Sequence, residues 1–362
     1  MSYLHIDLNE VTIRPFHPDD AADHHAMFSH PRVAEMLLQL PSMELIETER
    51  WANSEKAGRH RLVADWNGRV IGAINVTQHL RPRLTHSGTL GMMVHPNAWG
   101  QGVGSKLMAA ALDLSDNWLN LNRLELEVFT HNQPAIRLYE KFGFELEGTS
   151  RKAVFGDGRF LDEHVMARLH GNFPGPGEPT PPANPPPQAE FAPEDALIRP
   201  PRQEDTDDLY ACFRHPLVAR TTLQMPSQEI GNIQQRLAEP NKRIHRFVAD
   251  VSGKVVGTIS MYQSNTPRMA HKAGMGMMVH PAYWGKGIGS RLMGAVIDLA
   301  DNWLNVQRLE LEVNTDNPAG VRLYRKFGFE IEGTKRWHAF GDGRLADSHF
   351  MARIRGKRYS VS

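Results

Sequence analysis

The second half of this chain repeats the first half. Residues match at an offset of 185 positions, so that Trp99 corresponds to Trp284 and Tyr139 to Tyr324. Between residues 91–149 and 276–334, 40 of 59 aligned positions are identical. This period is far longer than the roughly 20 to 50 residues of the units that build solenoids. The repeat therefore predicts two whole domains of one fold.

Proline marks the boundary between the two halves. Segment 171–195 is rich in proline, which has no backbone N–H for a sheet ladder and favours extended polyproline geometry. We therefore expect an N-terminal domain over 1–170, a semi-rigid linker over 171–195 and a C-terminal domain over 196–362. Recognition of this segment by a polyproline-binding partner is the alternative.

The composition argues against several classes of protein. Lys plus Arg and Asp plus Glu number 41 each, so the net charge of zero predicts no general attraction to nucleic acid or to an anionic membrane. A single cysteine, Cys212, cannot form an internal disulfide, which fits a reducing, cytoplasmic setting. We expect neither a signal peptide nor a membrane span, because no apolar stretch approaches about 20 residues. His24, His25 and His30 have no acidic or cysteine partners at ligand spacing, so no metal site is expected.

One stretch in each half predicts an anion site. Residues 92–108 read as an apolar strand, a turn with glycines at 100, 102 and 104, and an apolar helix, and residues 277–293 repeat the pattern. Glycine removes the Cβ where the chain turns, so backbone N–H groups can close around a phosphate at the positive end of the helix. The Walker A pattern fails because Ser105 and Lys106 stand in reversed order. The Rossmann pattern fails because Leu107 occupies the place of its third glycine.

The order of the expected elements indicates an α/β domain. In the first half we expect strands at 11–14, 61–65, 70–78, 88–95 and 123–129, helices at 19–29, 43–54, 105–119 and 134–141, and two strands flanking the turn 156–158. Strand 123–129 alternates apolar and polar residues strictly, and the Asn-Gly pair at 67–68 predicts a hairpin. Each half is therefore expected to be a mixed, mostly antiparallel sheet with helices on both faces.

This combination of motifs resembles the GNAT family of acetyl-CoA-dependent N-acetyltransferases. The resemblance rests on the glycine turn, the alternating strand and the segment 132–144, Asn-Gln-Pro-Ala-Ile-Arg-Leu-Tyr-Glu-Lys-Phe-Gly-Phe, and it covers both halves nearly end to end. Segments 116–119, 123–126 and 144–149 are further similar to a bacterial subfamily that acetylates the α-amine of free amino acids. The resemblance implies two GNAT domains and an enzyme that takes acetyl-CoA as its cosubstrate.

The resemblance also implies where acetyl-CoA binds. Backbone amides of the glycine turn would hold the diphosphate, and the pantetheine arm would lie where the strands ending at His95 and Thr130 splay apart. Trp99 and Trp284 depart from the family pattern at its first position, which weakens side-chain contacts there and leaves the amides intact. The implied cofactor-binding residues are Met93, Val94, Gln101, Gly102, Val103, Gly104, Ser105 and Asn132 in the first half, and Met278, Val279, Lys286, Gly287, Ile288, Gly289, Ser290 and Asn317 in the second half.

Tyr139 and Tyr324 are the general acids that the resemblance implies. A phenol, with a pKa of about 10, is protonated at neutral pH and can donate its proton as the thiolate of CoA leaves. The alternative is a tyrosine whose ring only packs. Asn132 and Asn317 either contact CoA, cap the helix that follows, or do both. A lone cysteine in one half argues against a cysteine nucleophile.

The general base is less well defined, because residues 90–93 hold no glutamate where many family members carry one. Glu125 and Glu310 are the catalytic candidates. Glu127 with Glu312, a loop histidine, or ordered water are the alternatives. Glutamates at 125 and 127 share one face of their strand, so they can instead form a solvated or salt-bridged face.

The acceptor site is expected in the loops beside the glycine-turn strand and between the first two helices. Arg83 and Arg268 are candidates for binding a substrate carboxylate, because arginine can hold a carboxylate bidentately. The alternative is a pair of ordinary exposed loop arginines. The expected substrate-binding residues are Gln39, Arg83 and His86 in the first half, and Gln224, Arg268 and His271 in the second half.

We therefore expect an N-acetyltransferase that moves an acetyl group to a small primary amine, the α-amine of a free amino acid or of an amino-acid-like toxin. An aminoglycoside or a peptide N-terminus is the alternative acceptor. A different class of protein would have one catalytic half and one half that binds acetyl-CoA as a regulatory or structural partner. Two competent sites are favoured, because both halves keep the glycines, the asparagine and the tyrosine. The repeat further predicts an internal pseudo-dimer and leaves further oligomerisation open.

Overall fold

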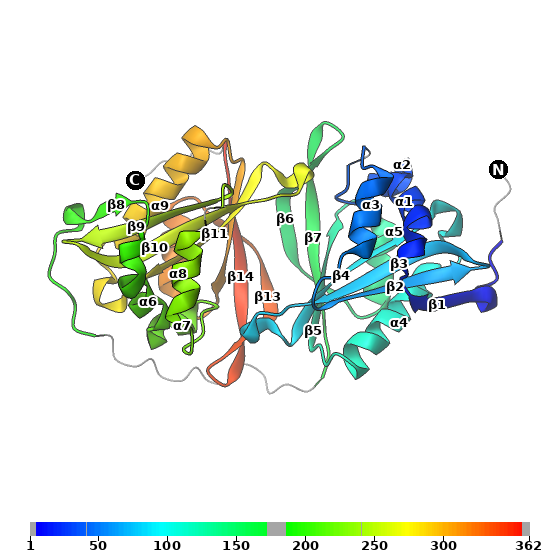
Figure 1. Cartoon of the computed structure of the whole chain (residues 1–362), viewed down its shortest axis with the longest axis horizontal. Helices are drawn as coiled ribbons and strands as arrows, with labels where there is room; N and C mark the ends of the chain where they lie inside the picture. Colours follow the sequence, from blue (N-terminus) through cyan, green and yellow to red (C-terminus); the bar gives the residue numbers. More distant parts are fainter. Residues whose placement is uncertain (1–4, 41, 172–185, 240, 357–362) are drawn as a thin grey trace. The chain divides into compact units, whose positions relative to one another are not determined.

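The chain divides into two compact units, Met1–Phe173 and Pro174–Ser362, which we call unit 1 and unit 2 (Figure 1). The computed structural model describes residues 5–40, 42–171, 186–239 and 241–356. Most of the expected linker 171–195 lies outside the described residues. Its described part, from residue 186, lies on unit 2, where the Ala189 N–H donates to the Ala282 carbonyl at 2.9 Å.

The strands of unit 1 form one mixed sheet in the order β1-β2-β3-β4-β5-β7-β6. Neighbouring strands are antiparallel, except that β4 and β5 are parallel. The strands are β1 (Val11–Pro15), β2 (Arg59–Trp66), β3 (Arg69–Gln78), β4 (Ser87–Val94), β5 (Arg123–Phe129), β6 (Glu145–Gly156) and β7 (Arg159–Leu169). The expected mixed, mostly antiparallel sheet is therefore confirmed.

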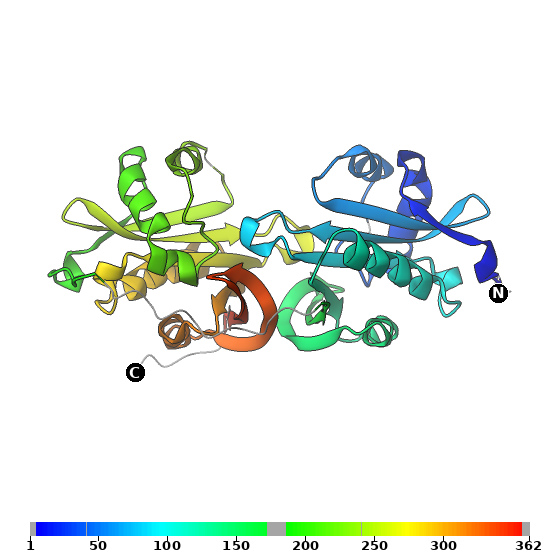
Figure 2. The same cartoon turned by 90° about the horizontal axis from the view of Figure 1, so that it is seen from below.

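Helices cover both faces of this sheet (Figure 2). They are α1 (Ala21–Ser29), α2 (Pro31–Ala34), α3 (Leu45–Asn53), α4 (Val103–Asn117) and α5 (Gln133–Lys141). Because side chains alternate along a strand, Val63 and Ala73 pack on the side of α1, whereas Ala64 and Ile74 pack on the side of α4. The ends of the expected elements differ from the observed ends by only one or two residues.

Unit 2 repeats this architecture, with the strand order β8-β9-β10-β11-β12-β14-β13. Its strands are β8 (Leu197–Arg199), β9 (Ile244–Val251), β10 (Lys254–Gln263), β11 (Lys272–Val279), β12 (Arg308–Asn314), β13 (Glu330–Gly341) and β14 (Arg344–Ile354). Its helices are α6 (Thr206–Arg214), α7 (Pro216–Thr221), α8 (Ile230–Ala238), α9 (Ile288–Asp298) and α10 (Pro318–Lys326). Within the described ranges, no helix is both long and apolar enough to cross a membrane.

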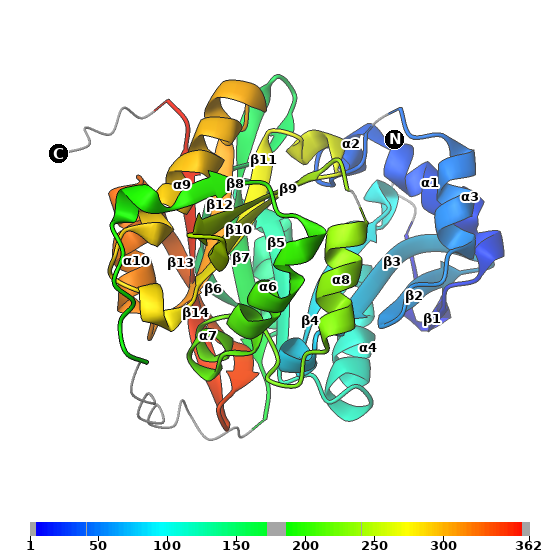
Figure 3. The same ribbon diagram turned by 60° about the vertical axis from the view of Figure 1, so that its left-hand side comes forward.

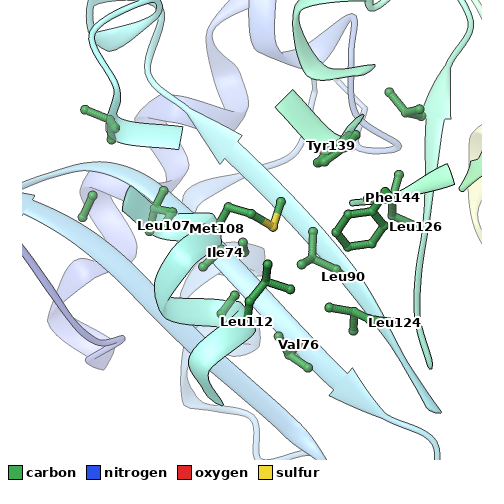
Figure 4. Close-up of a cluster of buried hydrophobic side chains, with 14 of the residues drawn as sticks. Ile74, Val76, Leu90, Leu107, Met108, Leu112, Leu124, Leu126, Tyr139 and Phe144 are labelled. Atoms are coloured by element: carbon green, nitrogen blue, oxygen red, sulfur yellow. The ribbon is translucent and has the colours of Figure 1, made fainter. Parts of the chain in front are cut away.

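The main core of unit 1 lies between α4 and the sheet. Leu107, Met108 and Leu112 of α4 recur at helical spacing and pack against Ile74 of β3 and Leu124 of β5 (Figure 4). Each fully buried aliphatic side chain of this kind stabilises the fold by about 1.5 to 3 kcal/mol. This core fixes the start of α4 against the ends of β4 and β5, where the candidate site lies.

A second, aromatic cluster packs beneath α1 and α3 in unit 1. The His24 ring stacks on Trp51 with centroids 4.7 Å apart and meets the edge of Phe28 at 4.4 Å. The Arg61 guanidinium lies 4.5 Å above Phe16 and 5.0 Å from Trp51. Burial, reinforced by the positive charge of Arg61, lowers the pKa of His24 to about 3. His24 is therefore neutral in the folded protein.

Mild acid is expected to destabilise unit 1 through His24. In the unfolded chain the imidazole takes up a proton below a pKa of about 6.5, whereas the folded state excludes that proton down to about 3. The loss of stability therefore begins below about pH 6.5 and amounts to about 2 kcal/mol at pH 5. Native-state hydrogen exchange at α1 amides, converted to opening free energies at pH 7 and pH 5, measures this loss.

His24→Leu is the matched control, because Leu209 occupies the corresponding position in unit 2. In this variant the opening free energy of the α1 amides should be the same at pH 7 and at pH 5. If the variant and the parent protein lost the same stability between pH 7 and pH 5, His24 would not be the cause of the loss.

Candidate functional site

A glycine turn joins β4 to α4 in unit 1. Gly100 and Gly102 have φ values of +73° and +88°, and Gly102 is the N-cap of α4. Gly285 and Gly287 precede α9 of unit 2 in the same way, with φ values of +73° and +82°. Residues with a Cβ rarely adopt this left-handed region. The turn delivers the first helical amides, which have no partners inside the helix, to the positive end of the helix dipole.

Leucine side chains also pack closely against glycines at the turn. A Cβ at Gly102 would lie 2.7 Å from Leu8 Cδ1, and a Cβ at Gly104 would lie 3.1 Å from Leu138 Cδ2. In unit 2 a Cβ at Gly289 would meet a leucine of α10 at 3.0 Å. The first turn of α4 is therefore pressed against the N-terminal segment on one side and α5 on the other.

The polar side chains at the turn hold the protein's own backbone. Gln101 Oε1 accepts from the Ile6 N–H at 2.8 Å, and Lys106 Nζ donates to the Leu8 carbonyl at 2.8 Å. In unit 2 the corresponding bonds run from Lys286 to the Ala189 carbonyl and from Arg291 to the Ala196 carbonyl. Backbone amides, more than side chains, are therefore the groups that the turn can offer to an anion.

The tryptophan at the head of each turn closes on the preceding strand. Trp99 Nε1 donates to the Val94 carbonyl at 2.7 Å, and Trp284 Nε1 donates to the Val279 carbonyl at 2.7 Å. The Met93 side chain is buried in the cluster on the α1 side of the sheet. Sequence reasoning noted these tryptophans only as departures, whereas the structure shows that they brace the turn.

The strand before each turn separates from its parallel neighbour. Residues 87–89 of β4 pair with 123–125 of β5, and residues 272–274 of β11 pair with 308–310 of β12. The described parallel ladder of β4 ends there, so residues 90–94 diverge from β5. The strand pairing thus ends where the splay is expected in both units, and we call the stretch beyond the last paired residues the opening.

A buried phenol follows this opening in each unit. Tyr139 on α5 is 7% exposed and Tyr324 on α10 is 8% exposed. Burial raises the pKa of each hydroxyl to about 12. Each ring packs on the phenylalanine five residues later, with centroids 6.0 Å apart, and Figure 4 shows Tyr139 beside Phe144. Neither hydroxyl forms a hydrogen bond with another described residue.

Asn132 and Asn317 cap the helices that carry the two tyrosines. Asn132 Oδ1 accepts from the Ala135 N–H at 3.4 Å, and Asn317 Oδ1 accepts from the Gly320 N–H at 3.0 Å. The capping role that sequence offered as one alternative is therefore present. It fixes the start of each helix and with it the position of the phenol seven residues later, nearly two turns along the helix.

An ion-paired network surrounds the first glutamate of β5. Arg123, 1% exposed, donates to both carboxylate oxygens of Glu147 at 2.9 and 2.7 Å and to Glu125 at 2.8 Å. In unit 2, Arg308 makes the same contacts with Glu332 and Glu310.

The charges around Glu125 and Glu310 determine how well these residues could act as the predicted general base. Burial raises the pKa of Glu310, but the positive charges of Lys272 and Arg308 outweigh it, and the net pKa is lowered. A carboxylate with a lowered pKa accepts a proton poorly at neutral pH. The contacts of Glu125 and Glu310 thus favour the salt-bridged alternative that the sequence left open. Sequence reasoning missed the arginine at their centre, although the Arg-Leu-Glu-Leu-Glu run occurs in both halves.

The next glutamate along β5 and β12 has different surroundings in the two units. Glu312 is 2.8 Å from Lys335 Nζ and 3.3 Å from His338 Nε2, and His338 Nδ1 lies 2.9 Å from Ser348 Oγ. In unit 1, serine and alanine stand at the positions that correspond to the lysine and histidine. Glu127 therefore has no counterpart of these two partners of Glu312.

The expected acceptor residues lie in separate loops. Arg83 and Arg268 are 8% and 9% exposed, within short 3-10 turns before β4 and β11. The His86 and His271 carbonyls accept backbone N–H groups that start the parallel pairing. In the loop before α3, Gln39 Oε1 is buried without a hydrogen-bond partner among the described residues, and Gln224 occupies the corresponding loop of unit 2. A buried amide oxygen in this state is suited to accept from an N–H group of a ligand.

The lone cysteine is remote from this chemistry. Cys212 is buried in α6, and burial raises the pKa of its thiol to about 12. It is therefore not a thiolate nucleophile at neutral pH.

A comparison with known protein families shows which kind of protein carries this glycine turn. The model described as the acetyltransferase (GNAT) family matches residues 26–144 and 206–329, which is one stretch in each unit and more than half of the chain. The chain belongs to the GNAT family. It is thus an acetyl-CoA-dependent acyltransferase that transfers an acetyl group to an amine. The resemblance seen in the sequence is confirmed for both halves of this GNAT protein.

Individual relatives span one unit of the chain. L-amino acid N-acetyltransferase AaaT of Escherichia coli (strain K12) is 36% identical over 159 residues, which are 44% of this chain and 98% of the relative. Spermidine N(1)-acetyltransferase of the same strain is 26% identical, over 42% of this chain and 81% of the relative. A solved acetyltransferase of the GNAT family from Streptococcus pneumoniae is 30% identical with a TM-score of 0.40, and the match covers 45% of this chain and 100% of that one.

The residues present fit the acetyl-CoA that the family uses. Left-handed glycines precede the first amides of α4, and the neighbouring strands β4 and β5 separate next to this turn. A protonated phenol with no partner among the described residues follows in the same unit. Unit 2 repeats the left-handed glycines, the separating strands and the buried phenol, but a Cβ at Gly287 would lie 3.5 Å from Pro193, an ordinary contact.

Proposed function

We propose that each unit is a complete N-acetyltransferase site whose acceptor is the α-amine of a free amino acid or of an amino-acid-like compound. The observation that supports two sites is the recurrence of the whole arrangement, from the left-handed glycines to the buried phenol, in both units. The acceptor class is supported by the relative named as an L-amino acid N-acetyltransferase, at 36% identity over 98% of its length.

We assign the cofactor contacts to the backbone. Amides of residues 101–105 in unit 1 and 286–290 in unit 2 would hold the diphosphate, as unpaired amides at a helix N-terminus do for other anions. Backbone groups of Met93, Val94, Met278 and Val279 would align the pantetheine arm in the opening beside the splayed strands. The carboxamide nitrogens of Asn132 and Asn317 would add a side-chain contact while the oxygens cap their helices.

The tyrosines are assigned the proton that the departing thiolate of CoA takes up, which balances the proton that the attacking amine loses. Bound acetyl-CoA supplies an acetyl thioester that an amine can attack directly. With a pKa of about 12, the Tyr139 and Tyr324 hydroxyls hold their protons throughout the neutral range and can donate at the sulfur as it departs. The base role of Glu125 and Glu310 stays a prediction, and their ion pairs argue for a small contribution.

We assign to the acceptor loops the role of orienting the acceptor, so that its amine faces the acetyl group. The buried Gln39 Oε1 would accept an N–H of the acceptor in unit 1, with Gln224 in the same loop of unit 2. Carboxylate binding by Arg83 and Arg268, with His86 and His271 beside them, stays a prediction. Burial of both arginines limits the guanidinium surface that a ligand can reach.

Free amino acids are expected to be the best acceptors in a direct assay. The purified full chain, incubated with acetyl-CoA and separate amines, should release free CoA thiol with amino acids and much less with their amides, an aminoglycoside, a peptide or spermidine. Mass spectrometry of the products should show one acetyl group on the α-amine. Acetylation of only a polyamine, aminoglycoside or peptide would overturn the acceptor class, and no CoA release with any amine would overturn the proposed function.

A further inference from the structure

Unit 2 contains a small cavity under the pair of helices α6 and α8, and its mostly apolar lining includes four polar residues. These helices lie side by side over the face of β9 and β10 (Figure 3). The cavity has a volume of about 20 Å³ for the centre of a water-sized sphere, which exceeds the roughly 10 to 15 Å³ that one water requires. Its polar lining is Arg236, Arg246, Thr258 and Ser260, and Leu209 and Phe213 form part of its apolar wall.

The polar lining carries positive charge, and no carboxylate among the described residues pairs with it. Neither Arg236 nor Arg246 forms a salt bridge or hydrogen bond with another described residue, and the Arg236 guanidinium lies 5.2 Å from the Phe213 ring centroid. Burial, followed by the repulsion from Arg236, lowers the pKa of Arg246. An anion placed between the two guanidinium groups would relieve that repulsion.

Two hydroxyl groups complete the lining. Thr258 and Ser260 are each 8% exposed, and Thr258 Oγ1 donates to the Phe247 carbonyl at 3.0 Å. The Ser260 hydroxyl has no hydrogen-bond partner among the described residues. A nearly buried donor of this kind is costly unless it binds water or a ligand. Ser260 therefore supplies an O–H donor beside the two guanidinium groups.

The corresponding place in unit 1 is filled. His24 and Trp51 stand where unit 2 has Leu209 and Arg236, and their rings stack 4.7 Å apart. Arg61, the counterpart of Arg246, donates to the Ala52 carbonyl at 3.0 Å and packs on aromatic rings. Its guanidinium is thus already satisfied by unit 1 itself. The charged cavity is a property of unit 2 among the described residues.

The cavity lies next to the opening between β11 and β12. Ser260 of β10 pairs with Gly276 of β11, and the two positions share one face of the sheet. Gly276 lies beyond Gly274, where the β11–β12 pairing ends. Neighbouring strands are about 5 Å apart, so an anionic group in the cavity lies about one strand spacing from β11.

We propose that Arg236, Arg246 and Ser260 form a carboxylate subsite for the acceptor of unit 2, which unit 1 replaces with an aromatic cluster. This inference rests on the proposed function, because it assumes an amine acceptor at the β11–β12 opening. The volume suits a single carboxylate group rather than a whole ligand. Both units then accept free amino acids, and unit 2 selects for the carboxylate of the acceptor more strictly than unit 1.

Arg246→Gln tests the subsite, with Arg61→Gln as the matched variant at the corresponding position of unit 1. Calorimetric titration of the full chain with an N-acetylated amino acid probes the carboxylate without turnover, and its C-terminal amide is the control ligand. Arg246→Gln should weaken binding of the acid at least tenfold and leave binding of the amide unchanged. Arg61→Gln should leave binding of the acid unchanged.

A second variant keeps the test valid if Arg246→Gln fails to fold. Arg236→Trp introduces the unit 1 residue, is expected to fill the cavity, and should produce the same loss for the acid. Equal weakening of acid and amide, or equal effects of Arg246→Gln and Arg61→Gln, would overturn the subsite. If the parent chain binds the acid through Arg246 but acetylates no amine, the subsite stands and the proposed function fails.

Discussion

Replacing Tyr139 and Tyr324 together with phenylalanine is expected to lower the turnover of acetyl transfer by about 10²- to 10⁴-fold, the usual contribution of a positioned general acid. Phenylalanine keeps the ring that packs on Phe144 and Phe329, so only the hydroxyl and its proton are lost. The KM for acetyl-CoA should change little. Steady-state release of CoA thiol at saturating acceptor, with thermal unfolding as a check on folding, provides the measurement.

The single variants separate two sites from one. Tyr139→Phe should retain the turnover that unit 2 supplies, and Tyr324→Phe should retain the turnover that unit 1 supplies. A silent single variant would instead support one catalytic unit and one regulatory unit. Tyr210→Phe, on α6, is the matched control for loss of a phenol elsewhere. If the turnover of the double variant stayed within twofold of that of the parent protein, the tyrosines would not be the general acids.

Replacing Gly102 with valine is expected to weaken acetyl-CoA binding in unit 1 at least tenfold. A left-handed residue with a Cβ costs about 1 to 2 kcal/mol, and the new Cβ would collide with Leu8 at 2.7 Å. The turn must then reorient the amides that we assign to the diphosphate. Hydrogen exchange with and without acetyl-CoA should show that protection at the start of α4 is lost while protection at α9 remains.

Two matched variants interpret this result. Gly287→Val should give the mirror outcome, with loss of protection at α9 only, because Gly287 has a φ of +82° at the same position. Gly68→Val shares the positive φ, +79°, in the β2–β3 turn, where a Cβ would meet no atom within 4 Å. If Gly68→Val abolished protection at α4 as strongly as Gly102→Val, the effect would be general destabilisation and not the loss of a cofactor site.

The fold and the cofactor turn could be predicted because their determinants are local. The alternating run Arg-Leu-Glu-Leu-Glu-Val-Phe gives β5 its full extent, Arg123–Phe129, and the glycines at 100 and 102 take the left-handed conformation that the turn demands. Because the chain is duplicated, each motif occurs twice, and the second copy supports the interpretation of the first. Family likeness, rather than spacing alone, then connected these motifs with acetyl-CoA.

The charges of the site could not be predicted, because their partners are distant in sequence. Arg123 and Glu147 are 24 residues apart and meet only because β5, β7 and β6 are neighbours in the sheet. The ion pair with Arg123 makes Glu125 part of a charged network, which argues for a small contribution of Glu125 as a base. Lys106 likewise serves the carbonyls of Leu8 and Val11, which strand and helix patterns alone do not bring together.

The difference between the units was also hidden in the sequence. Trp51 and Arg236 occupy corresponding places on amphipathic helices, where either residue suits the pattern. Only packing of α3 and α8 over their sheets shows that one completes an aromatic stack and the other lines a charged cavity. Two units with the same fold can therefore differ in how strictly they select the acceptor while sharing a cofactor.

Calorimetric titration of the full chain with acetyl-CoA, in the absence of acceptor, tests the central claim that each unit holds its own cofactor. We predict saturation at two molecules of acetyl-CoA per chain. Saturation at one molecule, or no measurable binding, would contradict it.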